Sequence, residues 1–235
     1  MAEKSKKKTK KKQTHEYKPT TVLLIRHGEN EWTASHKLAG RTPNVHLNEY
    51  GRKQAEALGK RLADTKLDAI YASPLDRTIE TAEAIARHHS IDIQTHDGLL
   101  EVDYGDWTGK KIKKLSKDPR WPVIQFYPSG AGFPGGETMY GMQTRFVQEV
   151  DQLVAKHSGQ TIAVVGHADL IKSAVAHYLG MHFDLFQRIV VSTTSITTIM
   201  FWPMGPRVVC VNDTNHVPPP PVKPNEEESK KKRKT

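Results

Sequence analysis

The stretch Thr21-Val22-Leu23-Leu24-Ile25-Arg26-His27-Gly28-Glu29 decides the fold of this chain. Its β-branched and leucine residues form an unbroken apolar run, which is typical of a strand buried on both faces of a parallel sheet. The run ends in Arg26 and His27, followed by a glycine that tolerates unusual backbone angles. Open α/β sheets bind ligands beyond the carboxyl ends of their strands. We therefore expect Arg26 and His27 to face a ligand. The alternative is a strand that ends in polar residues on its way into a loop.

The length and the cysteine count limit the kind of protein this can be. A chain of 235 residues can bury a sizeable core without disulfides or a structural metal. The single cysteine, Cys210, excludes an intramolecular disulfide and favours a reducing, cytoplasmic location. Cys210 lies in an apolar run, where we expect a small buried side chain. No stretch approaches the roughly 20 apolar residues of a membrane span, and the lysine-rich N-terminus lacks the apolar segment of a secretory signal.

The formal net charge of +9 belongs mostly to the two ends of the chain. Residues 1–18 carry a net +6 and residues 213–235 a net +2, which leaves +1 for residues 19–212. We predict a folded domain over 19–212 between two disordered tails, one basic (1–18) and one proline-rich and charged (213–235). We interpret the tails as solvated segments, and weak contact with polyanions is the alternative.

Between the tails, strand-like and helix-like apolar patterns alternate. The spacing predicts strands over 67–72, 91–94 and 161–166, helices over 48–64, 75–89, 139–156 and 169–179, and a closing hairpin over 195–202 and 207–211. Asn48 is a candidate N-cap and Gly180 a candidate residue after a helix end. Such alternation indicates an α/β fold with a mostly parallel sheet and an antiparallel edge strand.

Polar residues follow several of these elements in the same manner. Arg77 lies in the first turn of the helix after the second strand, and His167 follows the strand over 161–166. Glu101 lies in a turn-rich loop, where Asp103 and Asp106 are alternative carboxylates. Two arginines, two histidines and a carboxylate at one sheet edge suit phosphoryl transfer. Guanidinium groups bind phosphoryl oxygens, an imidazole attacks phosphorus, and a carboxyl group moves the leaving-group proton.

Four motifs now resemble those of the histidine phosphatase superfamily, in its phosphoglycerate-mutase-like branch. They are Leu-Ile-Arg-His-Gly-Glu (24–29), Ser-Pro-Leu-Asp-Arg-Thr (73–78), Leu-Leu-Glu-Val-Asp-Tyr-Gly-Asp-Trp-Thr-Gly (99–109) and Gly-His-Ala-Asp (166–169). The resemblance covers nearly all of 21–211, and within the branch the chain resembles small bacterial, actinobacterial-type phosphatases of uncertain substrate. It implies a three-layer α/β/α sandwich of the phosphoglycerate-mutase type.

The same resemblance implies a reaction and assigns its residues. His27 attacks phosphorus and becomes a phosphohistidine, with its other ring nitrogen donating to a backbone carbonyl. Arg26, Arg77 and His167 hold the phosphoryl oxygens. Glu101 protonates the leaving alkoxide and then takes a proton from water, which requires a raised pKa. The expected activity is hydrolysis of small phosphomonoesters to inorganic phosphate, with no metal and no cofactor.

Five further positions are expected to contact phosphate or substrate through the same resemblance. The family usually has asparagine where this chain has Thr33, a side chain with fewer donors. Asn30 is expected to compensate for that change. The other three positions are Gly40, Arg41 and Ala168.

Substrate choice is assigned to the irregular, aromatic segment over 118–137, within residues 110–137, which we interpret as a lid over the pocket. An ordinary packed loop is the alternative. The competing enzyme is a cofactor-dependent phosphoglycerate mutase, but Lys113, Lys114 and Arg120 replace the arginine pair that those enzymes place after the acid loop. A further alternative is an anion-binding protein that acts through its basic tails.

Overall fold

The computed structural model describes residues 17–221. The strands are β1 (Thr20–Arg26), β2 (Ala69–Ala72), β3 (Ile93–Thr95), β4 (Thr161–Gly166), β5 (Ile196–Trp202) and β6 (Gly205–Asp213). They form one six-stranded sheet in the order β3-β2-β4-β1-β5-β6. The first four are mutually parallel, and antiparallel pairing is confined to β1 with β5 and β5 with β6. The predicted α/β fold with an antiparallel edge is therefore confirmed.

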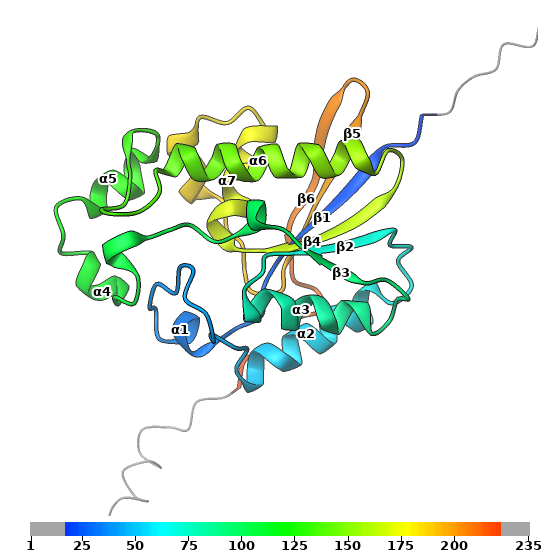
Figure 1. Ribbon diagram of the computed structural model, residues 1–235, viewed down its shortest axis with the longest axis horizontal. Coiled ribbons are helices and arrows are strands. Elements are labelled where there is room, and N and C mark those ends of the chain that lie inside the picture. Colours follow the sequence, from blue (N-terminus) through cyan, green and yellow to red (C-terminus); the bar gives the residue numbers. More distant parts are fainter. Residues whose placement is uncertain (1–16, 222–235) are drawn as a thin grey trace, which may run out of the picture.

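Helices cover both faces of this sheet, which gives the three predicted layers (Figure 1). Helices α2 (Glu49–Leu62) and α3 (Asp76–Ala86) lie on one face, and α6 (Met139–Lys156) and α7 (Ala168–Tyr178) on the other. Each face has its own hydrophobic cluster, because alternate residues of the central strand point in opposite directions. Leu23 and Ile25 of β1 join the α2–α3 side, whereas Val22 and Leu24 join the α6–α7 side.

Two predicted helix ends are confirmed in detail. The Asn48 side chain accepts a hydrogen bond from the Gly51 N–H and so caps α2. Gly180 follows α7 with a φ of +63°, the left-handed geometry that glycine adopts most easily. The remaining predicted boundaries differ from the structure by a few residues; α3, for example, ends at Ala86 rather than at residue 89.

The segment over 118–137 is not a lid over the pocket, and that prediction is wrong, because none of its residues lines the pocket. With residues 110–117 before it, the segment forms the short helices α4 (Ile112–Leu115) and α5 (Trp121–Phe126), whose buried residues Leu115 and Ile124 belong to the α6–α7 core. Trp121 stacks on the buried Trp107 with ring centroids 5.9 Å apart, and Ile124 and Phe133 are buried. Aromatic burial organises this segment in the absence of apolar periodicity. The packed-loop alternative therefore describes it.

The C-terminal boundary predicted at residue 213 is also wrong. Strand β6 continues through Asp213, and residues 214–221 follow it onto the body of the protein, where the Tyr50 hydroxyl donates to the Pro218 carbonyl at 2.7 Å. Residues 214–221 contain few apolar residues, so the sequence predicts disorder there although hydrogen bonds such as that of Tyr50 hold the segment. Cys210, predicted buried, is exposed because β6 is an edge strand. The predicted tails over 1–16 and 222–235 lie outside the described residues.

Candidate active site

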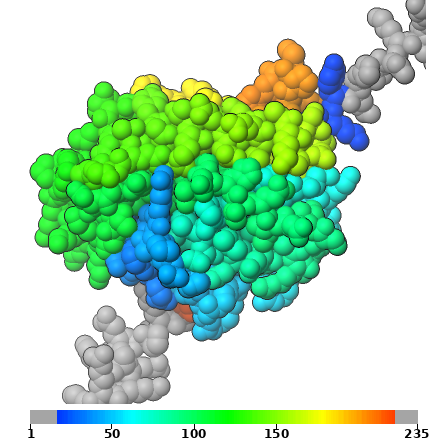
Figure 2. Space-filling model, in the orientation of Figure 1, coloured from blue at the N-terminus to red at the C-terminus, as the bar shows by residue number. Residues whose placement is uncertain are grey.

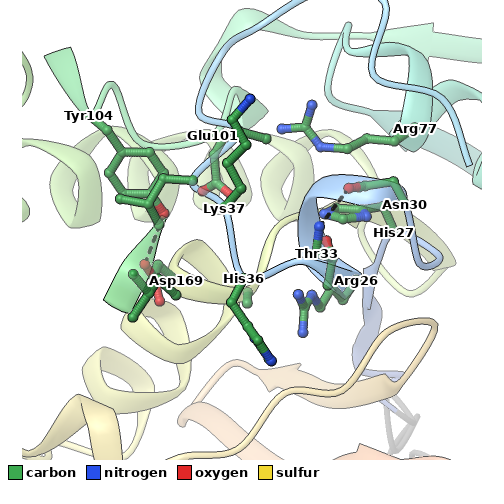
Figure 3. A pocket seen from close by; sticks show the side chains of 14 residues that line it. Arg26, His27, Asn30, Thr33, His36, Lys37, Arg77, Glu101, Tyr104 and Asp169 are labelled. Atoms are coloured by element: carbon green, nitrogen blue, oxygen red, sulfur yellow. Dashed lines mark hydrogen bonds between the residues drawn. The ribbon is translucent and has the colours of Figure 1, made fainter. Parts of the chain in front are cut away.

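A cavity of about 210 Å³ opens at the carboxyl ends of the parallel strands. Arg26 is the last residue of β1 and His27 follows it, while His167 follows β4 and Arg77 is the second residue of α3. Glu101 reaches the same edge from the loop between β3 and α4. Figure 3 shows Arg26, His27 and Arg77 on one side of the cavity, with Glu101 across from them. The sheet topology thus gathers the five predicted catalytic residues in one place.

His27 is held as a neutral imidazole with one free nitrogen. Its side chain is 4% exposed, and Nδ1 lies 2.7 Å from the Gly28 carbonyl oxygen. A carbonyl only accepts, so Nδ1 carries the proton and donates, which leaves the lone pair on Nε2. Burial lowers the pKa of His27 well below its ordinary 6.5, and the positive charges of Arg77 and Arg26 lower it further. His27 therefore has the neutral ring and the free lone pair that a nucleophile at neutral pH requires.

Two glycines let α2 approach the backbone next to His27. A Cβ atom on Gly51 would lie 1.9 Å from the Glu29 carbonyl oxygen, and one on Gly28 would lie 2.7 Å from the Gly51 carbonyl oxygen. Neither contact is sterically possible, so both positions require glycine. The Gly28 N–H also donates to Thr81 Oγ1 of α3 at 3.0 Å. The turn after β1 is thus fixed by the two helices beneath it.

Each of the two arginines donates one hydrogen bond to a backbone carbonyl and has further nitrogens without a hydrogen-bond partner. Arg26 Nη1 donates to the Val191 carbonyl at 2.9 Å, and Arg77 Nη2 donates to the Gly40 carbonyl at 2.7 Å. Arg26 Nε and both Nε and Nη1 of Arg77 are buried without a hydrogen-bond partner in the protein. Burial lowers the pKa of both guanidinium groups, yet arginine stays charged in proteins. Unpaired buried cations of this kind are stabilised by a bound anion.

Two more buried nitrogens complete this group of donors. Asn30 accepts from Trp32 N and Thr33 N through Oδ1 and so caps α1 (Glu31–Ala34), while its Nδ2 has no partner. His167 is fully buried, with Nε2 hydrogen-bonded to Ser73 Oγ at 3.0 Å and Nδ1 without a hydrogen bond. The His167 ring lies 5.3 Å from that of His27, centroid to centroid. His167 thus lies behind the cavity wall, next to His27.

Glu101 is a carboxyl group whose pKa suits proton transfer in both directions. Its Oε1 accepts from the Val102 N–H at 2.9 Å, and Oε2 lies 3.5 Å from His167 Nδ1. Burial and the nearby negative charge of Asp169 raise the pKa of Glu101 to about 7, against the opposing effect of Arg77. A group with this pKa is populated in both protonation states at neutral pH, as a general acid that later acts as a base requires.

The remaining predicted binding residues separate into two sets. Thr33 and Ala168 line the cavity, as does Asn30. Gly40 and Arg41 are not among the lining residues. Gly40 orients Arg77 through its carbonyl, while Arg41 Nε donates to the Glu101 carbonyl at 2.9 Å and Arg41 Nη2 pairs with Glu137. Gly40 and Arg41 therefore contact Arg77 and the backbone of Glu101 from outside the cavity.

The structure also reveals lining residues that sequence reasoning did not assign. His36, Lys37 and Leu38 form one rim because the segment after α1 pairs with the segment before α4, for instance through Ile112 N–H to the His36 carbonyl at 2.9 Å. Figure 2 shows this blue segment lying against the green one. Tyr104 and Asp169 form the opposite wall, joined by a 3.1 Å hydrogen bond from the Tyr104 hydroxyl. The alternative carboxylates Asp103 and Asp106 are absent from the lining.

Fold and site together define an α/β protein with two arginines and a buried histidine gathered at the carboxyl ends of its parallel strands. The model of the histidine phosphatase superfamily (branch 1) matches residues 22–214. This chain belongs to that superfamily, and the predicted family is therefore confirmed.

Individual relatives agree with this assignment. The chain is 29% identical over 201 residues to phosphoserine phosphatase 1 of Hydrogenobacter thermophilus, covering 83% of this chain and 93% of that protein. Among solved structures, YhfR of Bacillus stearothermophilus is 31% identical with a TM-score of 0.80, covering 85% of this chain and all of that one. A phosphoserine phosphatase of Entamoeba histolytica, solved with 3-phosphoglyceric acid, is 28% identical with a TM-score of 0.75, covering 84% and 99%.

No helix within 17–221 is long and apolar enough to cross a membrane. Over the same part of the chain, no group of three or more His, Cys, Asp or Glu side chains is arranged to hold a metal ion.

Proposed function

We propose that this protein is a phosphatase that hydrolyses small phosphomonoesters through a phosphohistidine on His27. The observation that carries the proposal is a set of five buried nitrogens without hydrogen-bond partners in the protein, supplied by Arg26, Arg77, Asn30 and His167, close to His27. Such donors suit the oxygens of a transferring phosphoryl group. Family membership and the phosphatase relatives support the same reaction.

The proposed reaction has two steps, and Glu101 acts in both. In the first, His27 Nε2 attacks phosphorus and the ester P–O bond breaks, while Glu101 gives its proton to the leaving oxygen. In the second, Glu101 takes a proton from water as the water oxygen attacks phosphorus. The P–N bond breaks, and inorganic phosphate leaves with His27 restored. Arg26 and Arg77 supply the positive charge, so we propose that the reaction needs no metal ion.

The direct test is phosphate release from a panel of metabolite phosphates by the full-length protein, together with detection of the intermediate. We expect an acid-labile, base-stable phosphoryl group on His27 after rapid quenching with a substrate, and unchanged turnover in the presence of EDTA. Absence of phosphate release across the panel, with no phosphorylated His27, would refute the proposal.

A phosphoglycerate mutase is the competing enzyme. It would need a pair of arginines within residues 110–137 that bind the carboxylate of the substrate. Arg120 forms a bidentate ion pair with Asp118 on the surface and does not line the cavity. Of residues 110–137, the lining includes Ile112 alone. We therefore expect 3-phosphoglycerate to be hydrolysed and not isomerised, even with 2,3-bisphosphoglycerate present. Net formation of 2-phosphoglycerate would favour the mutase.

Arg77 gives a test of the phosphate site itself. We expect Arg77→Lys to lower kcat/KM by about 10²-fold, because lysine keeps the charge but loses the planar fork that presents two free nitrogens. The affinity for inorganic phosphate should fall as well. The measurement is steady-state turnover with phosphate as the competing product. Arg87→Lys, at the exposed far end of the same helix, is the matched control and should behave like the wild type.

The rim of the cavity suggests substrates with a second anionic group. Lys37 lines the cavity with its ammonium 3.7 Å from the centroid of the Trp32 ring, and no carboxylate of residues 17–221 lies within ion-pair distance of it. His36 lies beside it on the same rim. A carboxylate near the phosphate ester would pair with this edge, as in phosphoserine or 3-phosphoglycerate. The cavity volume of about 210 Å³ suits molecules of that size.

Replacement of Lys37 tests this preference. We expect Lys37→Gln to raise KM for phosphoserine and 3-phosphoglycerate by about 10-fold, the value of one hydrogen bond to a charged group. KM for p-nitrophenyl phosphate should not change, because it has no carboxylate. Lys111→Gln is the control, since Lys111 pairs with Lys37 through the backbone but is exposed and outside the lining. An equal change with both substrates would contradict a carboxylate contact.

The basic tails are a separate matter. We propose that they take no part in phosphate release, with weak binding of polyanions as the alternative activity. Deletion of residues 1–16 and 222–235 should leave phosphate release unchanged. If the deletion removes binding to a polyanion such as RNA at low salt, the alternative holds for the tails. A cytoplasmic location is likewise proposed from the single cysteine.

A further inference from the structure

The end of the described chain passes over the loop that supports the catalytic residues. We call residues 212–221 the C-terminal strap; it begins in β6 and ends on α2. Asn212 Oδ1 accepts from the Ser192 N–H at 2.6 Å, and His216 Nε2 lies 3.0 Å from the Thr194 carbonyl oxygen. The Tyr50 hydroxyl anchors the strap to α2 at Pro218. The strap therefore contacts Ser192 and Thr194 of the loop over 191–195 and is itself fixed to a helix.

The loop over 191–195 in turn holds Arg26. Its Val191 carbonyl accepts from Arg26 Nη1 at 2.9 Å and so sets the direction of the guanidinium group. Its Thr194 N–H donates to the Arg26 carbonyl at 3.0 Å, with the His27 carbonyl at 3.4 Å. The same five-residue loop thus fixes a phosphate-binding side chain and the backbone that carries the nucleophile.

We infer that the C-terminal strap is a positioning element for catalysis, in which Asn212 and His216 hold the loop over 191–195 and thereby aim Arg26 and His27. The inference rests on the proposed phosphatase reaction for its kinetic consequence. It assigns a role to a segment whose composition predicts disorder, and to two residues that do not contact the cavity.

The backbone geometry explains why the loop needs external support. Thr194 has a φ of +55°, a left-handed conformation that β-branched residues rarely adopt and that tends to relax when contacts are lost. Asn212 has a φ of +60°, which asparagine tolerates well, and this conformation accompanies the side-chain contact with Ser192. The two strap contacts hold the strained loop in one conformation. If one contact is lost, the loop can shift by a fraction of an ångström and displace Arg26 and His27, and catalysis is sensitive to displacements of this size.

The hydrogen-bond chemistry of His216 fixes its tautomer. The Thr194 carbonyl only accepts, so Nε2 carries the proton and donates, and Nδ1 is buried without a partner. The Nε2–H donor is present in the neutral and the protonated imidazole alike. The contact is therefore a permanent support, and a glutamine side chain can replace its donor with an amide N–H.

A second tie to the same loop comes from α2. Gln54 accepts from the Glu29 N–H through Oε1 at 2.9 Å and donates to Thr193 Oγ1 through Nε2 at 2.9 Å. This link joins the turn after His27 to the middle of the loop without using the strap. Loss of one strap contact should therefore loosen the loop without unfolding the domain.

The test compares His216→Ala with His216→Gln in the full-length chain, with Asn215→Ala as the matched control on an exposed strap position. For His216→Ala we expect amide hydrogen exchange in residues 191–195 to rise by about 10-fold, the Kd for inorganic phosphate to rise several-fold, and kcat to fall by about 10-fold. His216→Gln should recover most of each change. Asn215→Ala should match the wild type in all three measurements.

A second pair of variants guards against a simple folding defect. Asn212→Asp keeps an oxygen acceptor for the Ser192 N–H and should resemble the wild type, whereas Asn212→Ala should resemble His216→Ala. If the alanine variants lower Tm but leave exchange in 191–195, phosphate affinity and kcat per folded molecule unchanged, the strap is a structural clamp and the inference is overturned. If the wild type itself releases no phosphate, the proposed reaction fails, while exchange and phosphate binding still decide the role of the strap.

Discussion

Replacing His27 with alanine is expected to lower kcat for every phosphomonoester by about 10⁴-fold or more. The expectation follows from its role, because no other imidazole nitrogen in the cavity combines a free lone pair with an opposite nitrogen locked as a donor. Removing a nucleophile eliminates the covalent route, and the arginines then have only the slow attack of water to accelerate. Inorganic phosphate should still bind, since the five unpartnered nitrogens belong to other residues.

The measurement combines turnover with trapping of the intermediate. The His27→Ala protein should yield no acid-labile phosphoryl group, while His88→Ala, an exposed histidine on the same α2–α3 side, should be phosphorylated like the wild type. Retention of more than about a tenth of the wild-type kcat in a folded His27→Ala protein would exclude His27 as the nucleophile.

The catalytic core of this site could be predicted from the sequence because it depends on strand ends. A buried parallel strand has a distinctive composition, and the residues after it must lie at the ligand-binding edge. That rule places Arg26, His27 and His167 before any side chain is seen. Arg77 follows from a similar argument at the start of α3. The resemblance to a family then supplied Glu101, which lies in a loop without periodicity.

The rest of the site could not be predicted, since it depends on contacts between segments distant in sequence. The rim formed by His36 and Lys37 exists because that segment pairs with residues 109–112. Residues 118–137 look irregular, yet Trp121 finds its partner in Trp107. The strap over 212–221 looks disordered because hydrogen bonds such as that of His216 have no signature in composition. Local sequence patterns reveal apolar periodicity only. The rim, the segment over 118–137 and the strap arise from tertiary packing, which such patterns do not reveal.

The ionised, buried carboxylate of Glu101 destabilises the folded protein, so the free energy of unfolding depends on pH. The pKa of Glu101 is raised from 4.5 to about 7, so the folded protein binds a proton that the unfolded chain releases. This contribution to stability is fully present below about pH 4.5 and is lost as the pH rises through 7. It corresponds to about 3 kcal/mol. His27 and His167 have lowered pKa values and act in the opposite direction at acidic pH, so a comparison with a Glu101 variant is needed to isolate the carboxyl group.

Glu101→Gln is the variant that separates these effects. Glutamine resembles the protonated carboxyl in shape and charge, so we expect it to stabilise the folded protein above pH 7 by up to about 3 kcal/mol and to change little below pH 4.5. Denaturant unfolding of both proteins at pH 4.5 and pH 8 measures the difference. An equal stability difference at the two pH values would contradict the raised pKa.

The kinetic effect of Glu101→Gln should depend on the leaving group. For an alkyl phosphate such as phosphoserine, the leaving alkoxide needs a proton, and we expect kcat to fall by about 10³-fold. The wild-type kcat/KM should itself decrease as the pH rises above about 7, because Glu101 then loses the proton it must donate. In Glu101→Gln, kcat/KM should no longer show this decrease above about pH 7.

p-Nitrophenyl phosphate distinguishes the two proposed roles of Glu101, because its phenolate leaves without a proton. His27 should be phosphorylated by this substrate at close to the normal rate even in Glu101→Gln. Hydrolysis of the phosphohistidine still requires a base, so the variant should release one equivalent of p-nitrophenolate in a burst and then turn over slowly. The burst amplitude, measured by stopped flow, should match the amount of phosphorylated His27. Slow release without a burst would instead mean that Glu101 mainly organises the site around Arg41 and His167, whose contacts it shares.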